Sequence, residues 1–330
     1  MTTALITGAA GQDGTILSRL LEREGYEIVA LVKPDHDTAK FSRYAPSAKI
    51  IECDLADADA LRSFVIDVAP QEIFNLGGIS SIMESVNNPE LTRQVNVAAV
   101  EAIVDGMRVI GKSGTLSPRL VEAASGTIFE NVDRAPQTEE SEPAPRTPYA
   151  QSKADVIQLL RKVRAEEGIF AVSAILYNHE SPLRGEGFVT RKITIAAARI
   201  AAGLQDRLEL GDIEVARDWG WAPDYVNGMR LMLGASVPND YILATGISHR
   251  LSFFIEKAFK AAGIAGWSNF VVSTADNTRK ADTNLLTGDS KAAYTQLGWR
   301  RTVDFDDMAS RMVEYDMELV RDPDALWLDF

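Results

Sequence analysis

The stretch that decides the fold is Thr7-Gly8-Ala9-Ala10-Gly11-Gln12-Asp13-Gly14. It follows a short apolar run at residues 4–7 and precedes a helical pattern at residues 15–24. Glycines between a strand and a helix permit a tight turn and a close approach of the backbone to a pyrophosphate, which also meets the positive end of the helix. The alternative is a plain turn with a glycine cap, but strand and helix patterns continue to alternate afterwards. The stretch therefore predicts a dinucleotide-binding loop that includes Gly8, Gly11, Gln12, Asp13 and Gly14.

Outward from this loop, β-branched runs alternate with segments whose apolar residues have helical spacing. Strands are predicted at residues 4–7, 27–32, 49–52, 72–76, 119–123 and 171–176. Helices are predicted at residues 15–24, 57–68, 90–110, 149–167, 188–204, 219–233, 252–262 and 303–319. This order predicts an α/β fold, a Rossmann-type doubly wound parallel sheet with a smaller C-terminal α/β substrate-binding lobe. We place the division at residues 1–177 and 178–330, with the lobe interleaved with the end of the sheet.

Composition narrows the classes of partner. Against 34 basic residues stand 47 acidic ones, which gives a net charge of -13 and disfavours nucleic acid and anionic membranes. The single cysteine, Cys53, excludes an intrachain disulfide and lies in an apolar run typical of a core position. The chain enters a strand pattern without a basic leader and has no run of about 20 apolar residues. We therefore expect a soluble, cytoplasmic protein, and no cluster of residues has the spacing of a metal site.

Residues after the other strands suggest which dinucleotide binds. Lys33 follows the second strand, where an enzyme that prefers NAD usually carries an acidic residue, so a 2′-phosphate and hence NADP is favoured. The alternative for Lys33 is a solvated lysine at the end of a strand. Asp54 and Leu55 follow the third strand and are placed to meet the adenine, and Leu76 and Gly77 follow the fourth, where a cofactor can pass closely.

A second set of residues predicts proton transfer. Tyr149 and Lys153 are four residues apart, which places a phenol and an ammonium group on one face of a helix. The cation favours the phenolate, so Tyr149 can exchange a proton with a sugar hydroxyl. Because the chain has eight tyrosines, this spacing alone could arise by chance. Ser125, which lies upstream after a predicted strand, adds the hydroxyl that would position the substrate oxygen.

Together these residues resemble the extended short-chain dehydrogenases/reductases, and within them the GDP-mannose 4,6-dehydratase family. Residues 177–194 read YNHESPLRGEGFVTRKIT and match the motif of that family almost throughout, as do RDWG at 217–220 and DYV at 224–226. The resemblance implies that Tyr149 is the acid/base and that Lys153 binds the nicotinamide ribose. It also implies cofactor contacts at His179 and Arg184. Substrate contacts are implied at Asn178, Val189, Lys192, Arg217, Arg279 and Asp282.

One departure from the family bears on the reaction. Counting as the family does, the glutamate that removes the C5 proton of the sugar falls on Thr127. Because a hydroxyl cannot act as a base near pH 7, we expect chemistry confined to C4 of a GDP-mannose-like sugar, as a dehydrogenase, a 4-keto reductase or a 4-epimerase. The alternatives are a 4,6-dehydratase, for GDP-mannose or a GDP-heptose, that recruits Glu130 or Glu180, and an inactive nucleotide-sugar or NADP sensor. The family also implies a homodimer through residues 90–110 and 149–167, and a tetramer is possible.

Overall fold

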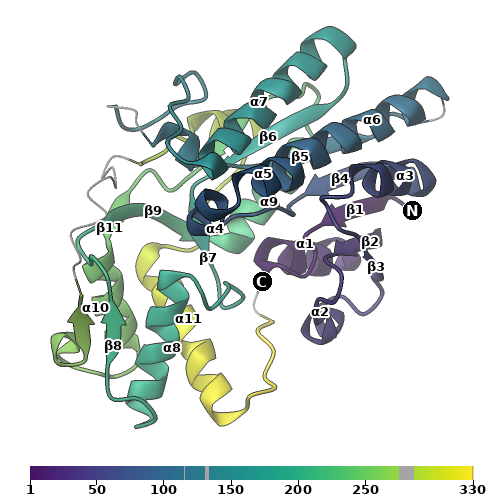
Figure 1. The fold of residues 1–330 in the computed structure, drawn as a ribbon. Helices are drawn as coiled ribbons and strands as arrows, with labels where there is room; N and C mark the ends of the chain where they lie inside the picture. The colour runs from purple at the N-terminus through teal and green to yellow at the C-terminus, as the bar shows by residue number, and fades with distance from the viewer. Residues whose placement is uncertain (115, 131–133, 275–285, 329) are drawn as a thin grey trace.

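The structure, a computed structural model, describes residues 1–114, 116–130, 134–274, 286–328 and 330 (Figure 1). Its main sheet has seven parallel strands in the order β10-β6-β5-β4-β1-β2-β3. The strands are β1 (Thr3–Thr7), β2 (Glu27–Val32), β3 (Lys49–Glu52), β4 (Glu72–Asn75), β5 (Arg119–Ser125), β6 (Ala171–Leu176) and β10 (Tyr241–Leu243). The direction of winding reverses between β1 and β4, the point at which doubly wound sheets bind ligands. The predicted fold class is confirmed, and the six predicted strands agree with the observed bounds within two residues.

Helices cover both faces of this sheet, because each strand is apolar on both sides. On β1, Ile6 packs with Leu17 in one core cluster, whereas its neighbour Leu5 packs with Val65 and Val104 in another. The first face carries α1 (Gln12–Arg23) and α9 (Ala222–Leu233), and the second carries α3 (Ala58–Val68), α6 (Ala99–Lys112) and α7 (Pro148–Glu167). Within the described ranges, no helix has the length and apolar character that crossing a membrane requires.

The helix predicted at residues 90–110 is present, but it contains a π-helical turn that the sequence did not predict. The structure has α5 (Pro89–Arg93), a π-helical turn at Gln94–Ala98 and then α6. Apolar spacing does not reveal such a turn, because the turn changes the hydrogen-bond pattern while the same side chains still face the core. It places Asn96, 1% exposed, where its amide bonds both the N–H and the C=O of Ile79 in the loop after β4.

The part of the chain after residue 177 adds smaller elements beside the sheet (Figure 1). They are α8 (Val189–Ala201), α10 (Leu251–Ala261) and α11 (Phe305–Arg321), with β7 (Asn178–Glu180), β8 (Leu208–Leu210), β9 (Ala216–Trp221), β11 (Ser248–Arg250) and β12 (Val271–Ser273). Strands β11, β9 and β7 form one small sheet, and β12 pairs with β8. This part also supplies β10 to the main sheet, and the division at residue 177 stays a prediction.

A second predicted helix, at residues 219–233, starts too early. Trp219 and Trp221 belong to β9, and both are buried, whereas the helix begins at Ala222 with Pro223 in its first turn. Proline has no N–H to donate to a preceding helical turn, so it is favoured in the first turn of a helix. Pro223 therefore marks the start of the helix. The short helices α2 (Ala39–Tyr44) and α4 (Ile82–Asn87) were not predicted.

Candidate active site

The glycine loop after β1 lies against the loop after β4, with no room for side chains between them. A Cβ on Gly8, whose φ is 63°, would lie 2.7 Å from Gly77 Cα, and a Cβ on Gly14 would lie 2.5 Å from the carbonyl oxygen of Gly8. At the start of α1, Gly11 is the N-cap residue and no side chain caps the first turn. This leaves backbone N–H groups at the positive end of a helix, an arrangement that fits the pyrophosphate of a dinucleotide.

Gln12 and Asp13 turn their side chains toward β7 and the residue after it. Gln12 Nε2 donates to the carbonyl oxygen of His179 at 3.1 Å, and Ser181 Oγ donates to Gln12 Oε1 at 2.9 Å. The ring nitrogens of His179 lie 2.8 Å from Asp13 Oδ2 and 2.7 Å from the carbonyl oxygen of Tyr177. A carbonyl oxygen and an ionised carboxylate oxygen carry no proton and can only accept. Both ring nitrogens must therefore donate, which requires an imidazolium. This cluster joins the glycine loop to the small sheet.

The ionisation of this pair agrees with that geometry. Burial disfavours the charged imidazolium, but the Asp13 carboxylate outweighs it, so the pKa of His179 is raised. Burial likewise opposes the Asp13 carboxylate, but His179 outweighs it and the pKa of Asp13 is lowered. Arg184 extends the cluster, with its Nε 3.3 Å from Glu180 Oε2 and its guanidinium 3.6 Å from the centre of the Phe188 ring.

The remaining predicted cofactor residues lie at the same edge of the sheet. Lys33 is exposed directly after β2, and Asp54 is exposed after β3, where its carboxylate accepts from the N–H of Ala56 at 2.9 Å. Leu55 is partly buried against the loop after β4, because a Cβ on Gly77 would lie 2.5 Å from its Cδ1. Leu76 directly follows β4. Cys53 is buried as predicted, and burial raises the pKa of its thiol to about 11.

The predicted acid/base and its hydroxyl partner lie at the ends of α7 and β5. Tyr149 is partly buried in the first turn of α7, which Thr147 caps by accepting from the N–H of Ala150 at 3.2 Å. Ser125 ends β5 and accepts from the N–H of Thr127 at 3.3 Å and from Thr127 Oγ1 at 3.0 Å. Thr127, the residue that the sequence resemblance aligns with the family's catalytic glutamate, therefore presents a hydroxyl bonded to Ser125.

Lys153 is bonded to a chain of buried polar side chains. Its Nζ donates to Glu122 Oε1 at 2.8 Å, Asn75 Nδ2 donates to Glu122 Oε2 at 2.5 Å, and Thr7 Oγ1 donates to Asn75 Oδ1 at 2.6 Å. The N–H of Gly77 donates to Thr7 Oγ1 at 2.9 Å. We call Thr7, Asn75 and Glu122 the polar rung. It connects the predicted active-site lysine with the backbone beside the glycine loop.

Sequence reasoning missed the polar rung and Asn96. Asn96 Nδ2 donates to Ser152 Oγ at 3.0 Å, and Ser152 Oγ donates to the carbonyl oxygen of Tyr149 at 2.7 Å, so Asn96 ties the loop after β4 to the first turn of α7. The available signal was a carboxylate and an amide, Glu122 and Asn75, inside strands that are otherwise apolar on both faces.

The predicted substrate residues come from β7, α8 and β9. Asn178 is exposed on β7, and Arg217 is partly buried on the parallel neighbour β9, with its Nη1 donating to the carbonyl oxygen of Ala216 at 2.7 Å. Val189 and Lys192 are exposed in the first turn of α8. The predicted positions outside the described residues are Arg279 and Asp282. Of these residues, Lys192 and Arg217 carry positive charge, and both belong to the part of the chain after residue 177.

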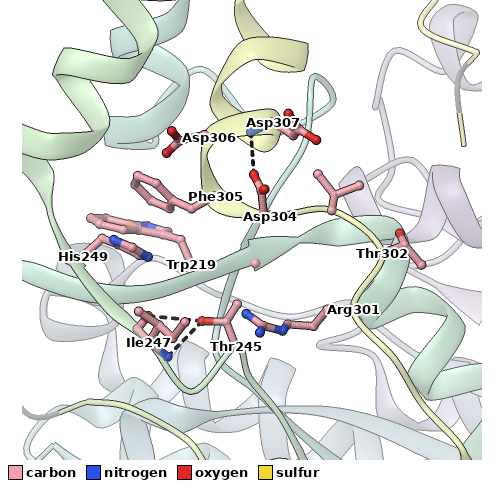
Figure 2. Close-up of a pocket in the computed structure, with 12 residues that line it drawn as sticks. Trp219, Thr245, Ile247, His249, Arg301, Thr302, Asp304, Phe305, Asp306 and Asp307 are labelled. Carbon is pink, nitrogen blue, oxygen red and sulfur yellow. Dashed lines mark hydrogen bonds between the residues drawn. The ribbon is translucent and has the colours of Figure 1, made fainter.

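A separate pocket of about 460 Å³ lies between β9, β11 and the start of α11 (Figure 2). On one side His249 stacks on Phe305 at 3.9 Å beside Trp219, and Arg301 and Thr245 lie on the opposite side. None of the described residues predicted for catalysis or cofactor binding lines this pocket. In the same described part of the chain, no group of three or more metal-ligating side chains comes together.

Comparison with known proteins now adds to this geometry. The sequence model of the family "GDP-mannose 4,6 dehydratase" matches residues 5–312. GDP-mannose 4,6 dehydratase 2 of Arabidopsis thaliana is 35% identical over 328 residues, which cover 96% of this chain and 87% of the relative. A GDP-mannose 4,6-dehydratase of Sinorhizobium fredii is 34% identical over 343 residues, covering 96% and 97%.

Solved structures share the fold at lower identity. A UDP-glucose 4-epimerase of Thermotoga maritima with UDP-glucose superposes with a TM-score of 0.85 at 21% identity, covering 97% of this chain and all of the epimerase chain. RMD of Pseudomonas aeruginosa, complexed with NADPH, gives 0.80 at 22% identity, covering 96% and 99%. The family match spans most of the chain and includes the glycine loop, Tyr149 and Lys153. The chain is therefore an enzyme of the GDP-mannose 4,6 dehydratase family, within the extended short-chain dehydrogenases/reductases.

Proposed function

We propose that this protein is an NADP-dependent nucleotide-sugar enzyme that acts at C4 of a GDP-mannose-like sugar without efficient dehydration. The reaction would be that of a dehydrogenase, a 4-keto reductase or a 4-epimerase. The single observation that carries the proposal is the combination of Ser125, Tyr149 and Lys153 with a hydroxyl, Thr127, at the position of the family's catalytic base.

The residues around C4 are suited to proton transfer. When bound, a nicotinamide cofactor supplies or accepts the hydride at C4. Tyr149 Oη would take the proton of the C4 hydroxyl when that carbon is oxidised and return it when the ketone is reduced, while Ser125 Oγ would hold the same oxygen. Lys153 provides the positive charge that favours the phenolate, since it lies four residues along the same helix.

Elimination needs a base in addition to these groups. Removal of the C5 proton next to a C4 ketone requires a group that is unprotonated near pH 7, and the threonine hydroxyl is not such a group. Thr127 Oγ1 already donates its proton to Ser125 Oγ at 3.0 Å. The pair therefore supports redox chemistry at C4 and gives the C6 hydroxyl no assistance in leaving.

The two carboxylates that could replace the base are engaged elsewhere. Glu180 is 1% exposed, accepts from Thr190 Oγ1 at 2.7 Å and lies beside Arg184. Glu130 accepts from the N–H of Arg146 at 3.3 Å. Both contacts favour the C4 reaction over dehydration by a substitute base.

The choice of NADP and of a GDP-sugar rests on the cations and on the relatives. Lys33 is exposed after β2 and forms no ion pair with the residues that the structure describes, so its ammonium is available to a 2′-phosphate. RMD was solved with NADPH, which is consistent with this choice. The relatives that are 35% and 34% identical are named as GDP-mannose 4,6-dehydratases. Lys192 and Arg217 would face the diphosphate of such a sugar nucleotide.

The test is incubation of the purified protein with GDP-mannose and NADP⁺, followed by mass spectrometry of the products. We expect a C4 ketone with NADPH, or a 4-epimer, in either case without loss of the mass of one water. Loss of one water would refute the proposal and indicate a dehydratase that uses another carboxylate. If GDP-mannose and GDP-heptoses all give no turnover while NADPH and the GDP-sugar bind, the protein is a sensor.

A further inference from the structure

The polar rung crosses three adjacent strands on the face of the sheet that α7 covers. Thr7 is the register partner of Asn75, and Asn75 is the register partner of Glu122. Partners in a parallel sheet point to the same face, and Leu5 and Leu120, two residues before Thr7 and Glu122, pack in the core cluster beneath α6 and α7. The carboxylate of Glu122 is thus presented directly to the helix that carries Lys153.

This carboxylate lies in a place that stability alone does not favour. Glu122 is 0% exposed and the Lys153 side chain is 7% exposed. Removing two charges from water costs several kcal/mol each, and buried ion pairs are often no more stabilising than apolar residues of similar size. Burial raises the pKa of Glu122 despite Lys153, and Glu122 raises the pKa of Lys153 against the effect of burial. Burying this ion pair therefore costs desolvation free energy, and the pair lies beside the predicted active site.

The rung also determines where the lysine ammonium lies. A Cβ on Gly78 would be 3.9 Å from Lys153 Nζ, so the ammonium lies against the loop after β4. The same loop is held by the bond from the N–H of Gly77 to Thr7 Oγ1. Lys153, the loop after β4 and the start of the glycine loop are thus held in one hydrogen-bonded unit that passes through Glu122.

We propose that Glu122 is a positioning residue that holds Lys153 Nζ beside the cofactor loops and sets the charge experienced by Tyr149. The inference rests on the proposed function in one respect, namely that Tyr149 and Lys153 carry out the proton transfer. Tyr149 and Lys153 lie four residues apart on α7, so they are neighbours on one face of that helix. Because the Glu122 carboxylate offsets the lysine charge, it determines how strongly that charge favours the phenolate.

Two substitutions separate the two parts of this role. Glu122→Gln removes one negative charge and keeps the size of the side chain, so loss of a proton from Tyr149 becomes easier and the phenol should ionise at a lower pH. Glu122→Asp keeps the charge but shortens the side chain, so Lys153 must move to keep the ion pair. In that variant we expect NADPH to bind about tenfold more weakly, the size of one lost charge-assisted hydrogen bond.

Ionisation of Tyr149 can be measured without any substrate. Tyrosinate absorbance is followed against pH in the wild type and in Tyr149→Phe, and the difference isolates Tyr149 from the other seven of the eight tyrosines. The same difference is taken with Glu122→Gln in both backgrounds. The matched control is Asp240→Asn, because Asp240 is also a buried carboxylate, 2% exposed, paired with Arg164 of α7 at 2.7 Å. Arg164 is fifteen residues from Tyr149, about 20 Å along the helix at 1.5 Å per residue.

A lower ionisation pH in Glu122→Gln, with no change in Asp240→Asn, supports the proposal. An unchanged value in folded Glu122→Gln, or an equal shift in Asp240→Asn, overturns it and leaves the pair a structural feature. If Glu122→Gln does not fold, NADPH affinity in Glu122→Asp decides, and wild-type affinity there overturns the proposal. Since no sugar is present, a failure here is distinct from a failure of the proposed reaction.

Discussion

Introduction of a carboxylate at position 127 is the sharpest test of the proposal that dehydration fails because this position carries no base. Thr127 is partly buried, and its Oγ1 lies 3.0 Å from Ser125 Oγ, the hydroxyl proposed to hold the oxygen on C4. In Thr127→Glu a longer side chain starts from the same backbone position. We expect its carboxylate to reach the C5 proton of the bound sugar and to remove it once C4 is a ketone.

The size of the effect follows from the role of the group. A positioned general base contributes about 10²–10⁴ in rate. At 1.36 kcal/mol for each factor of ten, this corresponds to about 3–5 kcal/mol of activation free energy. Because a newly introduced group is held less precisely than one with built-in supporting contacts, we expect the lower end, a gain of about a hundredfold in the rate of water loss.

The assay uses GDP-mannose and NADP⁺ in D₂O, with products resolved by mass spectrometry and NMR. Thr127→Glu should introduce deuterium at C5 and lose one water, whereas the wild type should do neither. Thr127→Gln is the matched control, since it has the same shape without a base. The reasoning is refuted if the wild type already exchanges C5, or if Thr127→Gln gains elimination to the same extent as Thr127→Glu.

Three further outcomes are expected. Lys33→Glu should lower NADPH affinity by about tenfold or more relative to NADH in fluorescence titrations, because it reverses the charge facing a 2′-phosphate. Gly14→Ala should lower the free energy of unfolding by about 1–3 kcal/mol in urea titrations, because its Cβ would lie 2.5 Å from the Gly8 carbonyl oxygen. His179→Gln should be less stable than the wild type chiefly between pH 3.8 and 6.5, the ordinary pKa values of Asp13 and His179. The raised pKa of His179 means that this difference shrinks as pH rises through it, and a difference that grows above pH 6.5 contradicts the charged pair.

Local patterns predicted the elements that carry the predicted site residues. The glycine loop, the six strands of the first half and the four-residue spacing of Tyr149 and Lys153 each depend on short-range geometry, which composition and periodicity report directly. Periodicity was less informative where hydrogen bonding changes without a change in burial. For that reason the π-helical turn at Gln94–Ala98 was not predicted, and residues 219–221 at the end of β9 were predicted to be helical.

The sequence by itself thus determined the fold class and the family, and it predicted which groups react. Only the tertiary structure decided their partners. Glu122 meets Lys153 31 residues away, and Asp13 meets His179 166 residues away. Strand order and register determine these partners, because parallel strands that are distant in sequence place their residues side by side at one edge of the sheet. A buried charge must be paired, and it pairs with the opposite charge that lies nearest to it at that edge. No local pattern in the sequence shows which residue that will be.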